Sequence, residues 1–465
     1  MTSREGRSPP PRASVPEDAR ALDAAHVWHP FTQMAEYAAD DPLVVVRAEG
    51  HDLVDDRGRR LFDATSALWC NLFGHRVPEI DDAVRRQLER VAHTTLLGAT
   101  HPGAAELAAR LVAAAPPGLT RVFFSDDGAT AVESALKIAF QYRLLTQGRE
   151  AAARAVYLSL DNAYHGDTLG AAAVGGVDLF HETFRPILLP TLKTPSPYCY
   201  RCPLGRTPGD CPIDRGDELE KVLAREGGRV SAVLVEPGVQ AAAGMIVQPP
   251  GFLSRVAEAC RRHGALLVLD EVATGFGRTG SLFACQREGV TPDLLCLAKG
   301  LTGGYLPLAA TLATEEVYRA FLGRYEEHRH FFHGHTYTGN PLGCAAALAT
   351  IGLLADGKVV RSVDGKGRVL REALGPVEAH RHVGEVRQAG LMCGVELVAD
   401  RGTKAGFPPA ERVGYRLCRA MRDRGVFIRP LGDVIVLMPP LTATEDELRR
   451  LAGALHAALV ERFGA

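Results

Sequence analysis

The sequence predicts an α/β protein with a mostly parallel sheet, and two patterns support this fold class. Apolar runs of strand length recur at 121–124, 156–160, 232–235, 265–269, 294–298 and 306–312. Segments with helical spacing of apolar residues lie between several of these runs. Strands that alternate with helices are typical of a mostly parallel sheet that is covered on both faces.

Two of the helical patterns are well defined, because apolar residues recur at intervals of three and four. The pattern that follows "RVFF" comprises Val132, Ala135, Leu136, Ala139 and Phe140. The pattern that precedes "ALLVLD" comprises Phe252, Leu253, Val256, Ala257 and Cys260. We expect each set to form the buried stripe of a helix that packs on the sheet.

The pattern of predicted elements changes near residue 346. From there on the chain is mostly helical, with a few strands in "GEVRQAGLMCGVEL" and "GVFIRPLGDVIVLMPP". We predict a large domain at 76–345 and a smaller α+β domain at 346–465, which the segment 21–75 completes. Residues 1–20 are rich in Pro, Ser and Arg and contain no apolar stretch. They are expected to form a disordered tail and not a secretory signal.

Composition excludes several classes of function. The chain has 465 residues, a formal net charge of -2 and a sequence pI of about 6.8. No overall positive field favours nucleic acid or an anionic membrane, so we expect neither as a partner. No stretch approaches the roughly 20 apolar residues that span a bilayer. We therefore expect a cytoplasmic protein.

The ten cysteines do not suggest a disulfide framework in a chain of this length. Cys199 and Cys202, in "SPYCYRCPLGRTPGDCP", have the spacing of metal ligands, and Cys211 follows. A structural zinc needs four ligands, and no second pair lies nearby, although His181 could be recruited. We predict a proline-rich surface loop with reduced thiols and no metal, and a metal site is the alternative.

Lys299 is the first candidate functional residue. It follows the apolar run 294–298 and precedes a glycine-rich turn in "PDLLCLAKGLTGG". The ordinary interpretation is a solvated lysine at a surface loop, because lysine stems often cover apolar surface. The alternative is a desolvated lysine, which loses its charge easily and becomes a nucleophile toward carbonyl carbon.

Two further polar features follow predicted strands, at the edge where ligands of open α/β sheets bind. In "FFSDDGATAVESALK", Gly128 and Ala129 begin a helix whose free N–H groups could hold a phosphate. Asp270 ends "ALLVLD" and is either a helix cap or the partner of a cationic ligand nitrogen.

"GFGRTG" at 275–280 matches the dinucleotide fingerprint G-x-G-x-x-G, with Asp293 near the expected distance for a ribose-binding acid. However, "DEVAT" separates the strand from the first glycine, and no full helix follows. Asp293 also precedes the next apolar run, whereas the fingerprint requires it at the end of that strand. The context therefore argues against a nicotinamide cofactor.

A lysine, an anion cradle and a buried carboxylate together match pyridoxal phosphate, which has an aldehyde, a phosphate and a pyridinium nitrogen. The motifs "LDEVATGFGRTGSLFA", "PDLLCLAKGLTGGYLPLAAT" and "HGHTYTGNPLGCAAALA" resemble, in order, the core motifs of class III (subgroup II) aminotransferases. With "HVWHPFTQM", "YHGDTLGA" and "VFIRPLGD", the resemblance narrows to the branch that transaminates 8-amino-7-oxononanoate in biotin synthesis. It extends from about residue 25 to the end of the chain.

The resemblance implies a pyridoxal phosphate enzyme of fold type I, with a seven-stranded type of sheet in the large domain. It implies a homodimer with active sites at the interface and a ping-pong transfer of an amino group. Lys299 is expected to form the Schiff base with the cofactor and to move the proton on the substrate. The expected cofactor-binding residues are Gly128, Ala129, Tyr164, Glu236, Asp270, Val272, Lys299 and, toward the other subunit, Thr336.

On the substrate side the resemblance implies that Arg429 pairs with the carboxylate of the keto substrate, where a fork of donors suits a carboxylate. Arg278 is expected to line the substrate site. The other residues expected there are Phe31, Leu68, Trp69, Tyr164, Gly334 and His335.

The amino donor is the point at which the sequence departs from the commonest family pattern. Members that use S-adenosylmethionine usually carry a Trp-Trp pair, Tyr in "HPYT" and Pro in "GPT". This chain has Leu68-Trp69, Phe31 and His335 at those positions, which resembles members that use L-lysine. We therefore favour lysine over S-adenosylmethionine.

Two other functions remain open from the sequence. One is an ω-amino-acid aminotransferase of the ornithine or 4-aminobutyrate type, although "WHPFTQM" and "ALWCNLFGH" favour the biotin branch. The other is a non-catalytic regulatory protein that binds pyridoxal phosphate. Such a protein has no need of the substrate-side arginines, Arg278 and Arg429.

Overall fold

The structure, a computed structural model, describes residues 19–206 and 210–464. The predicted disordered tail therefore lies outside the described residues, apart from Ala19 and Arg20. These two residues do not extend the tail, because they begin helix α1 (Ala19–His26), and Arg20 pairs with Asp41 and Asp56.

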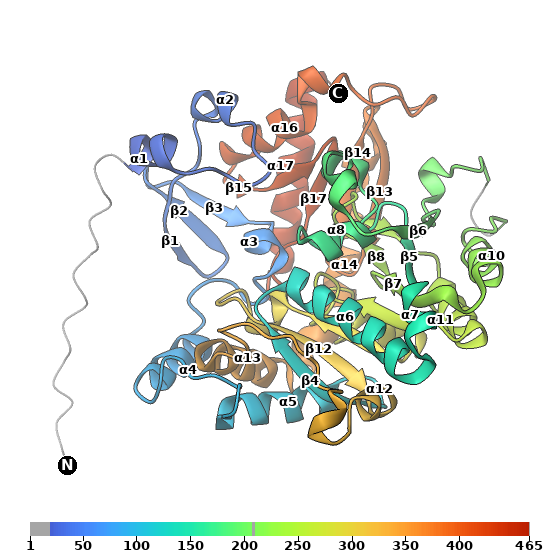
Figure 1. Cartoon of the computed structure of the whole chain (residues 1–465). Coiled ribbons are helices and arrows are strands. Elements are labelled where there is room, and N and C mark those ends of the chain that lie inside the picture. Colours follow the sequence, from blue (N-terminus) through green and yellow to red (C-terminus); the bar gives the residue numbers. More distant parts are fainter. Residues whose placement is uncertain (1–18, 207–209, 465) are drawn as a thin grey trace, which may run out of the picture.

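A seven-stranded sheet forms the centre of the molecule (Figure 1). Its strands, in spatial order, are β4 (Leu119–Ser125), β12 (Ala309–Thr314), β11 (Leu294–Leu297), β10 (Leu266–Asp270), β7 (Val230–Val235), β5 (Val156–Leu160) and β6 (Thr191–Thr194). β12 is antiparallel to both of its neighbours, and the remaining strands are parallel to one another. The predicted fold class is confirmed.

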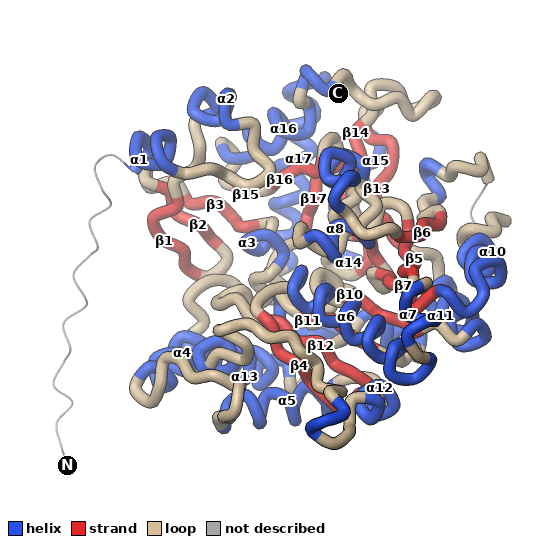
Figure 2. The backbone as a smooth tube through the Cα atoms, in the orientation of Figure 1, coloured by secondary structure: helices blue, strands red, loops and turns tan. Residues whose placement is uncertain are grey.

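Helices cover both faces of this sheet, as the alternation of strands and helices predicts (Figure 2). Side chains from successive positions of one strand belong to two different apolar clusters: Val268 packs with helix α6, and Leu267 and Leu269 pack in the cluster that contains α11. The helices of this part are α4 (Pro78–Leu88), α5 (Pro102–Ala114), α6 (Gly128–Gln147), α7 (Arg149–Ala153), α8 (Leu169–Val174), α9 (Asp178–His181), α10 (Asp217–Glu226), α11 (Phe252–His263), α12 (Glu315–Ala320) and α13 (Pro341–Leu354). The two-stranded pair β8 (Val239–Gln240) and β9 (Ile246–Val247) lies beside the main sheet.

The predicted stripe of α11 is buried along its whole length. In α6 the stripe is buried except for Phe140, which is 40% exposed, so its assignment to the buried face was wrong. α6 begins with a capping box, in which the Asp127 carboxylate accepts from the Thr130 N–H and the Thr130 hydroxyl accepts from the Asp127 N–H. The cap fixes where the helix starts.

The C-terminal part contains an antiparallel sheet in the order β13 (Val383–Ala389), β14 (Met392–Leu397), β17 (Val434–Leu437) and β16 (Arg429–Leu431). Its helices are α14 (Lys358–Ala373), α15 (Gly375–Ala379), α16 (Val413–Arg422) and α17 (Glu445–Phe463).

Short 3-10 helices are distributed along the described chain, at Ala38–Asp40, Glu182–Ile187, Cys199–Arg201, Gly227–Arg229, Ala284–Glu288, Lys299–Thr302, Tyr325–Glu327 and Pro409–Glu411.

The N-terminal segment joins this C-terminal part through a shared sheet. After α1 come α2 (Met34–Tyr37), β1 (Val45–Glu49), β2 (Asp52–Asp55), β3 (Arg60–Asp63) and α3 (Ser66–Trp69). β15 (Val426–Phe427) pairs in parallel with β3, which places residues from both ends of the chain in one sheet. This arrangement is the one expected if 21–75 completes the smaller domain, but the domain boundaries themselves stay a prediction.

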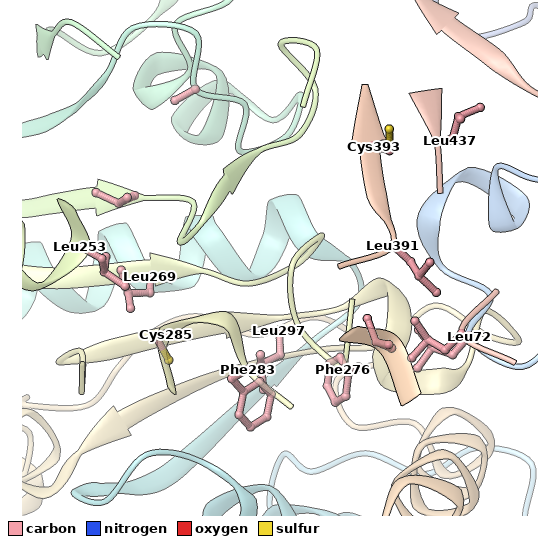
Figure 3. Packing of buried hydrophobic residues seen from close by; sticks show 14 of the residues in the cluster. Leu72, Leu253, Leu269, Phe276, Phe283, Cys285, Leu297, Leu391, Cys393 and Leu437 are labelled. Carbon is pink, nitrogen blue, oxygen red and sulfur yellow. The ribbon is translucent and has the colours of Figure 1, made fainter. Parts of the chain in front are cut away.

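One apolar core connects the two parts of the chain. Leu269 of the large sheet, Phe276 and Cys393 of β14 belong to the same cluster, and Figure 3 shows all three within one close view of the buried residues. Among the described residues, no single helix is long and apolar enough to cross a membrane, and α13 with α14 meets that test only as a pair bent by 67°.

Candidate active site

A cavity of about 730 Å³ opens at the carboxyl edge of the large sheet. The segments that follow β4, β5, β7, β10 and β11 all contribute to its wall, because parallel strands end at the same edge. Its lining includes Trp69, Gly128, Ala129, Tyr164, Glu236, Asp270, Val272 and Lys299. These residues, which are dispersed in the sequence, are therefore brought together in one site.

Lys299 begins the 3-10 helix Lys299–Thr302 directly after β11. Its backbone lies in the left-handed region, at φ +46°, where non-glycine residues are uncommon and often functional. Burial lowers the pKa of the Lys299 amine, and the carboxylates of Asp270 and Glu236 oppose that shift. A lowered pKa increases the fraction of neutral, nucleophilic amine.

Asp270 ends β10, next to the strand that leads to Lys299, and its register partner on that strand is Cys296. One carboxylate oxygen accepts from the Val272 N–H at 3.0 Å, and the other lies 2.7 Å from His165 Nδ1. Both Asp270 and His165 are buried. This pairing holds the carboxylate in one orientation toward the cavity.

His165 is the main residue of the site that sequence reasoning missed. It directly follows Tyr164 in "YHGDTLGA", so its place in that motif was the available signal. Asp167 was also missed, and its Oδ2 accepts a hydrogen bond of 2.7 Å from the Tyr164 hydroxyl. Burial raises the pKa of Tyr164, and the Asp167 carboxylate adds to the shift. The phenol is therefore held protonated and oriented.

Glu236 follows β7 and lies at the bottom of the cavity, 4% exposed. Its two carboxylate oxygens accept from the N–H groups of Tyr164 and Ala241, each at 3.0 Å. Burial raises the pKa of Glu236 to about 7, and the Asp270 charge adds to the effect. Glu236 therefore fixes the backbone that carries Tyr164.

The first turn of α6 lies at the cavity wall. The capping box uses the Thr130 N–H, and the N–H groups of Gly128 and Ala129 have no acceptor within the helix. A Cβ at Gly128 would come within 2.6 Å of Val272 Cγ1, so this close approach of the backbone requires glycine. The arrangement offers two N–H donors and a helix dipole to an anion.

These residues fit pyridoxal phosphate. The cavity contains a nucleophilic amine, a fixed carboxylate and an anion-binding helix start, which suit the aldehyde, the ring nitrogen and the phosphate. In addition, two buried polar atoms of the lining, His165 Nε2 and Thr168 Oγ1, have no hydrogen-bond partner among the described residues. Buried polar atoms in native proteins normally have partners, so these atoms are available to a ligand.

A second cavity of about 480 Å³ shares Trp69, Tyr164 and Lys299 with the first. Its other lining residues are mostly apolar, and Arg429 is the one with a permanent positive charge: Phe31, Thr65, Leu68, Val177, Leu179, Phe180, Ala242, Ala243, Arg429, Pro430, Leu431, Gly432 and Val436. Five of the predicted substrate-side residues are thus placed in one cavity: Phe31, Leu68, Trp69, Tyr164 and Arg429.

Other predicted residues lie outside both linings. Gly334 and Thr336 are exposed on the segment before α13, and His335 Nδ1 lies 3.0 Å from Asp126 Oδ2. Arg278 is not among the lining residues of either cavity: its side chain is buried and donates to backbone carbonyls, and its place at the substrate site stays a prediction. The fingerprint-like segment 275–280 is accordingly a structural loop.

Comparison with known proteins agrees with this geometry. The family model for aminotransferase class-III matches residues 34–459. The chain belongs to the class-III aminotransferase family. It is therefore a transaminase that depends on pyridoxal phosphate, and the predicted resemblance and cofactor are confirmed.

Several relatives are similar over nearly their whole length. The chain is 51% identical to the adenosylmethionine-8-amino-7-oxononanoate aminotransferase of Geobacter sulfurreducens, over 95% of this chain and 97% of the relative. The enzyme of the same name from Nitratidesulfovibrio vulgaris is also 51% identical, over 97% of this chain and 83% of the relative.

Solved structures show the same fold. The enzyme of that name from Methanocaldococcus jannaschii superposes with a TM-score of 0.90 at 42% identity, over 95% of this chain and 98% of that one. An amine transaminase from an uncultivated Pseudomonas species, in its PLP-bound form, superposes with a TM-score of 0.89 at 37% identity, over 94% and 98%.

The cysteine loop is separate from these cavities. Cys202 Sγ lies 3.7 Å from Cys211 Sγ, and Cys199 Sγ lies 3.3 Å from the Asp214 carboxylate. Within the part of the chain that the structure describes, no group of three or more His, Cys, Asp and Glu side chains forms a metal site. His181, the possible fourth ligand, instead stacks on Tyr164, with ring centroids 6.2 Å apart.

Proposed function

We propose that this chain transfers an amino group to 8-amino-7-oxononanoate and so forms 7,8-diaminononanoate for biotin synthesis. The observation that carries the proposal is the second cavity, whose mostly apolar wall contains both Lys299 and Arg429. A substrate with a carboxylate, a run of methylene groups and a ketone matches that wall. The names of the curated relatives support the same substrate.

The cofactor is proposed to lie in the first cavity. Gly128 and Ala129 would hold its phosphate through their N–H groups, and Asp270 would hold its ring nitrogen, with His165 fixing the carboxylate. Tyr164 and Val272 would contact the two faces of the ring, and Glu236 would support Tyr164 from behind. When bound, pyridoxal phosphate supplies an electron sink for the carbanion that forms at the substrate carbon bearing nitrogen.

Lys299 has two tasks in this reaction. Its amine would hold the cofactor through the aldehyde group. Nζ would also take the proton from the substrate carbon that bears the nitrogen, and would return a proton to the corresponding carbon of the keto substrate. Burial, which lowers the pKa of this amine, favours the neutral form that accepts the proton.

Arg429 is proposed to bind the carboxylate of the keto substrate. It begins β16 and pairs in register with Val436 of β17, which also lines the second cavity. A guanidinium on a paired strand is held more firmly than one on a free loop. Phe31, Leu68 and Trp69 would then contact the apolar part of the substrate.

For the amino donor we propose L-lysine, with S-adenosylmethionine as the alternative. Phe31 packs edge-on against Phe180, with ring centroids 5.2 Å apart, and has no hydroxyl to offer a polar donor. Leu68, at the position of the first indole in the common pattern, is 53% exposed in the second cavity. His335 carries a ring that ion-pairs with Asp126 when protonated, where the common pattern has proline.

We also propose a homodimer in which Thr336 reaches the phosphate site of the other subunit. Thr336 is exposed and does not line the cavities of its own chain. Large apolar side chains are exposed on nearby loops, including Leu97 at 90% and Tyr337 at 59%. Exposed apolar surface of this kind marks contact sites between proteins.

A cytoplasmic location completes the proposal, supported by the ten free thiols, which stay reduced in that compartment. An ω-amino-acid or amine transaminase is the second candidate, because one solved neighbour is an amine transaminase at 37% identity.

Rescue of a bacterial strain that lacks this step of biotin synthesis tests the proposal. The wild-type gene should restore growth without biotin, and Lys299→Ala should not, although the variant protein is present at equal level. Growth with Lys299→Ala, or failure of a folded, cofactor-loaded wild-type protein to rescue, would refute the assignment. Supplying purified enzyme with lysine or S-adenosylmethionine separately then identifies the donor.

A further inference from the structure

The turn that carries Leu68 and Trp69 has an unusual handedness. Ser66, Ala67, Leu68 and Trp69 all have positive φ, at 50°, 48°, 66° and 72°. Ala67 and Leu68 have ψ of 47° and 53°, close to the values of a left-handed helix. L-residues disfavour this conformation, and consecutive ones without glycine are rare. Contacts from elsewhere in the molecule must therefore hold the turn.

Two of these contacts come from the smaller part of the chain. The Asp63 carboxylate accepts from the Ala67 N–H at 2.8 Å. The Ser66 hydroxyl donates to the Met438 carbonyl at 2.6 Å. Both hydrogen bonds fix the first half of the turn to the smaller part of the chain.

Arg278 attaches the end of the turn from the other side. Its guanidinium donates to the carbonyls of Trp69 at 3.2 Å, Asn71 at 2.8 Å and Pro439 at 2.8 Å. The residue is 1% exposed, and among the described residues its side-chain hydrogen bonds go to these carbonyls and to the Ser66 hydroxyl. A desolvated guanidinium surrounded by neutral acceptors is costly, which indicates a specific task at this position.

The conformation of this turn sets the position of Trp69 at the two cavities. Trp69 lines both of them, and its ring centroid lies 5.1 Å from Lys299 Nζ. The indole packs in a small apolar cluster that includes Val239 and Met245. A change in the handedness of the turn would move the indole away from the amine.

We propose that Arg278 is a positioning residue that holds the left-handed turn Ser66–Trp69, and thereby keeps the Trp69 indole against Lys299. It acts through the backbone and does not bind the substrate carboxylate. The inference rests on the proposed function only for the choice of substrates in the kinetic part of its test.

Tryptophan fluorescence of the cofactor-free protein tests the structural part. The chain has two tryptophans, and Trp28 is 86% exposed and lines neither cavity. In a Trp28→Phe background, Trp69 is the single reporter. We expect Arg278→Met to shift its emission to longer wavelength and to raise its acrylamide quenching constant at least twofold, with a smaller change for Arg278→Lys.

Arg143 provides a matched control. It is buried like Arg278, and its Nε donates to the Ala151 carbonyl at 3.1 Å. Arg143 belongs to helix α6 and makes no contact with the turn in these hydrogen bonds. Arg143→Met should leave the Trp69 emission unchanged. Unchanged Trp69 quenching in a folded Arg278 variant would overturn the proposal.

A second variant keeps the test decisive if Arg278→Met does not fold. Glycine adopts positive φ readily, so Ala67→Gly should restore the turn in part when the arginine is weakened. We expect the double variant Arg278→Lys with Ala67→Gly to reverse at least half of the rise in the acrylamide quenching constant of Trp69 that Arg278→Lys alone causes. No recovery in the double variant would contradict the proposed role.

Kinetics separate positioning from substrate binding. Because Trp69 borders both cavities, Arg278→Lys should lower kcat/KM by a similar factor, about tenfold, for the donor and the keto-acid half-reactions. A rise in KM for the keto acid alone, with unchanged fluorescence, would identify Arg278 as a substrate ligand. If 8-amino-7-oxononanoate proves not to be the substrate, the fluorescence result still decides the role of Arg278.

Discussion

Replacement of Arg429 tests how the keto substrate of the proposed reaction is bound. Arg429 is exposed at the start of β16 and is the permanent cation of the second cavity. A hydrogen bond to a charged group contributes about 1.5–3 kcal/mol. Solvent competes at an exposed site, so we expect the lower part of that range, about 1.5–2 kcal/mol, for Arg429→Met. This corresponds to a loss of roughly 10- to 30-fold in kcat/KM for the keto acid.

The assay follows the visible absorbance of the bound cofactor in each half-reaction separately. Arg429→Met should slow the half-reaction with 8-amino-7-oxononanoate by this factor, whether or not the half-reaction with lysine, which also carries a carboxylate, slows as well. Arg429→Lys keeps the charge but not the fork of donors, so its loss should be intermediate. Arg416, an exposed arginine of α16 that lines neither cavity, provides the control variant Arg416→Met. An unchanged half-reaction with 8-amino-7-oxononanoate in a folded, cofactor-loaded Arg429→Met variant would refute the carboxylate role.

Three further predictions concern stability. Burial lowers the pKa of Lys193 to about 7, so between pH 7 and 10 the unfolded chain binds one proton more than the folded chain, and stability should rise with pH. Lys193→Met should therefore raise the free energy of unfolding by on the order of 2–4 kcal/mol at pH 7. Denaturant unfolding at a series of pH values should show that this gain disappears toward pH 10. A gain that does not depend on pH would contradict the buried charge. The left-handed conformation of Ala67 costs about 1–2 kcal/mol, so Ala67→Gly should be neutral or stabilise the protein by up to about 1 kcal/mol in urea unfolding. Ala109→Gly in α5, in contrast, should destabilise it by about 1 kcal/mol. Equal losses in the free energy of unfolding of the two variants would contradict the left-handed turn. Removal of the cofactor should lower Tm and weaken the dimer in sedimentation, because a ligand bound only to the assembled state stabilises that state; a monomer with full cofactor occupancy would contradict shared sites.

The sequence predicts the large sheet well because most of its strands are buried on both faces. Apolar runs make up most of β7, β10 and β11, and the polar residues at the ends of such runs were found for the same reason. β6 was missed, since the sequence "TLKT" is polar and the strand lies at the edge of the sheet, where one side needs no apolar partner. Edge strands have weaker patterns than central ones.

The local structure of the site could be predicted less fully. "SALW" contains no glycine and consists of residues compatible with an ordinary helix, so nothing in it indicates a left-handed turn. The turn depends on Asp63, Met438 and Arg278, which are far apart in the sequence. Tertiary contacts of this kind override local propensity, and a sequence without coordinates does not contain them in readable form.

Arg278 shows what a family pattern leaves undetermined. The motif "GFGRTG" matches the family, and an arginine beside a substrate site is a natural carboxylate ligand. In the structure its guanidinium is used by three backbone carbonyls. Spacing along the chain identifies a residue type at a motif position, whereas the direction of its side chain depends on segments that converge only in the fold.

Direct detection of the product tests the central claim. Purified enzyme loaded with pyridoxal phosphate is mixed with 8-amino-7-oxononanoate and either lysine or S-adenosylmethionine, and 7,8-diaminononanoate is measured by chromatography and mass spectrometry. Formation of this product with at least one donor, and its loss in Lys299→Ala, is the predicted result. Absence of the product with both donors, while the same preparation transaminates ornithine or 4-aminobutyrate, would contradict the proposed function.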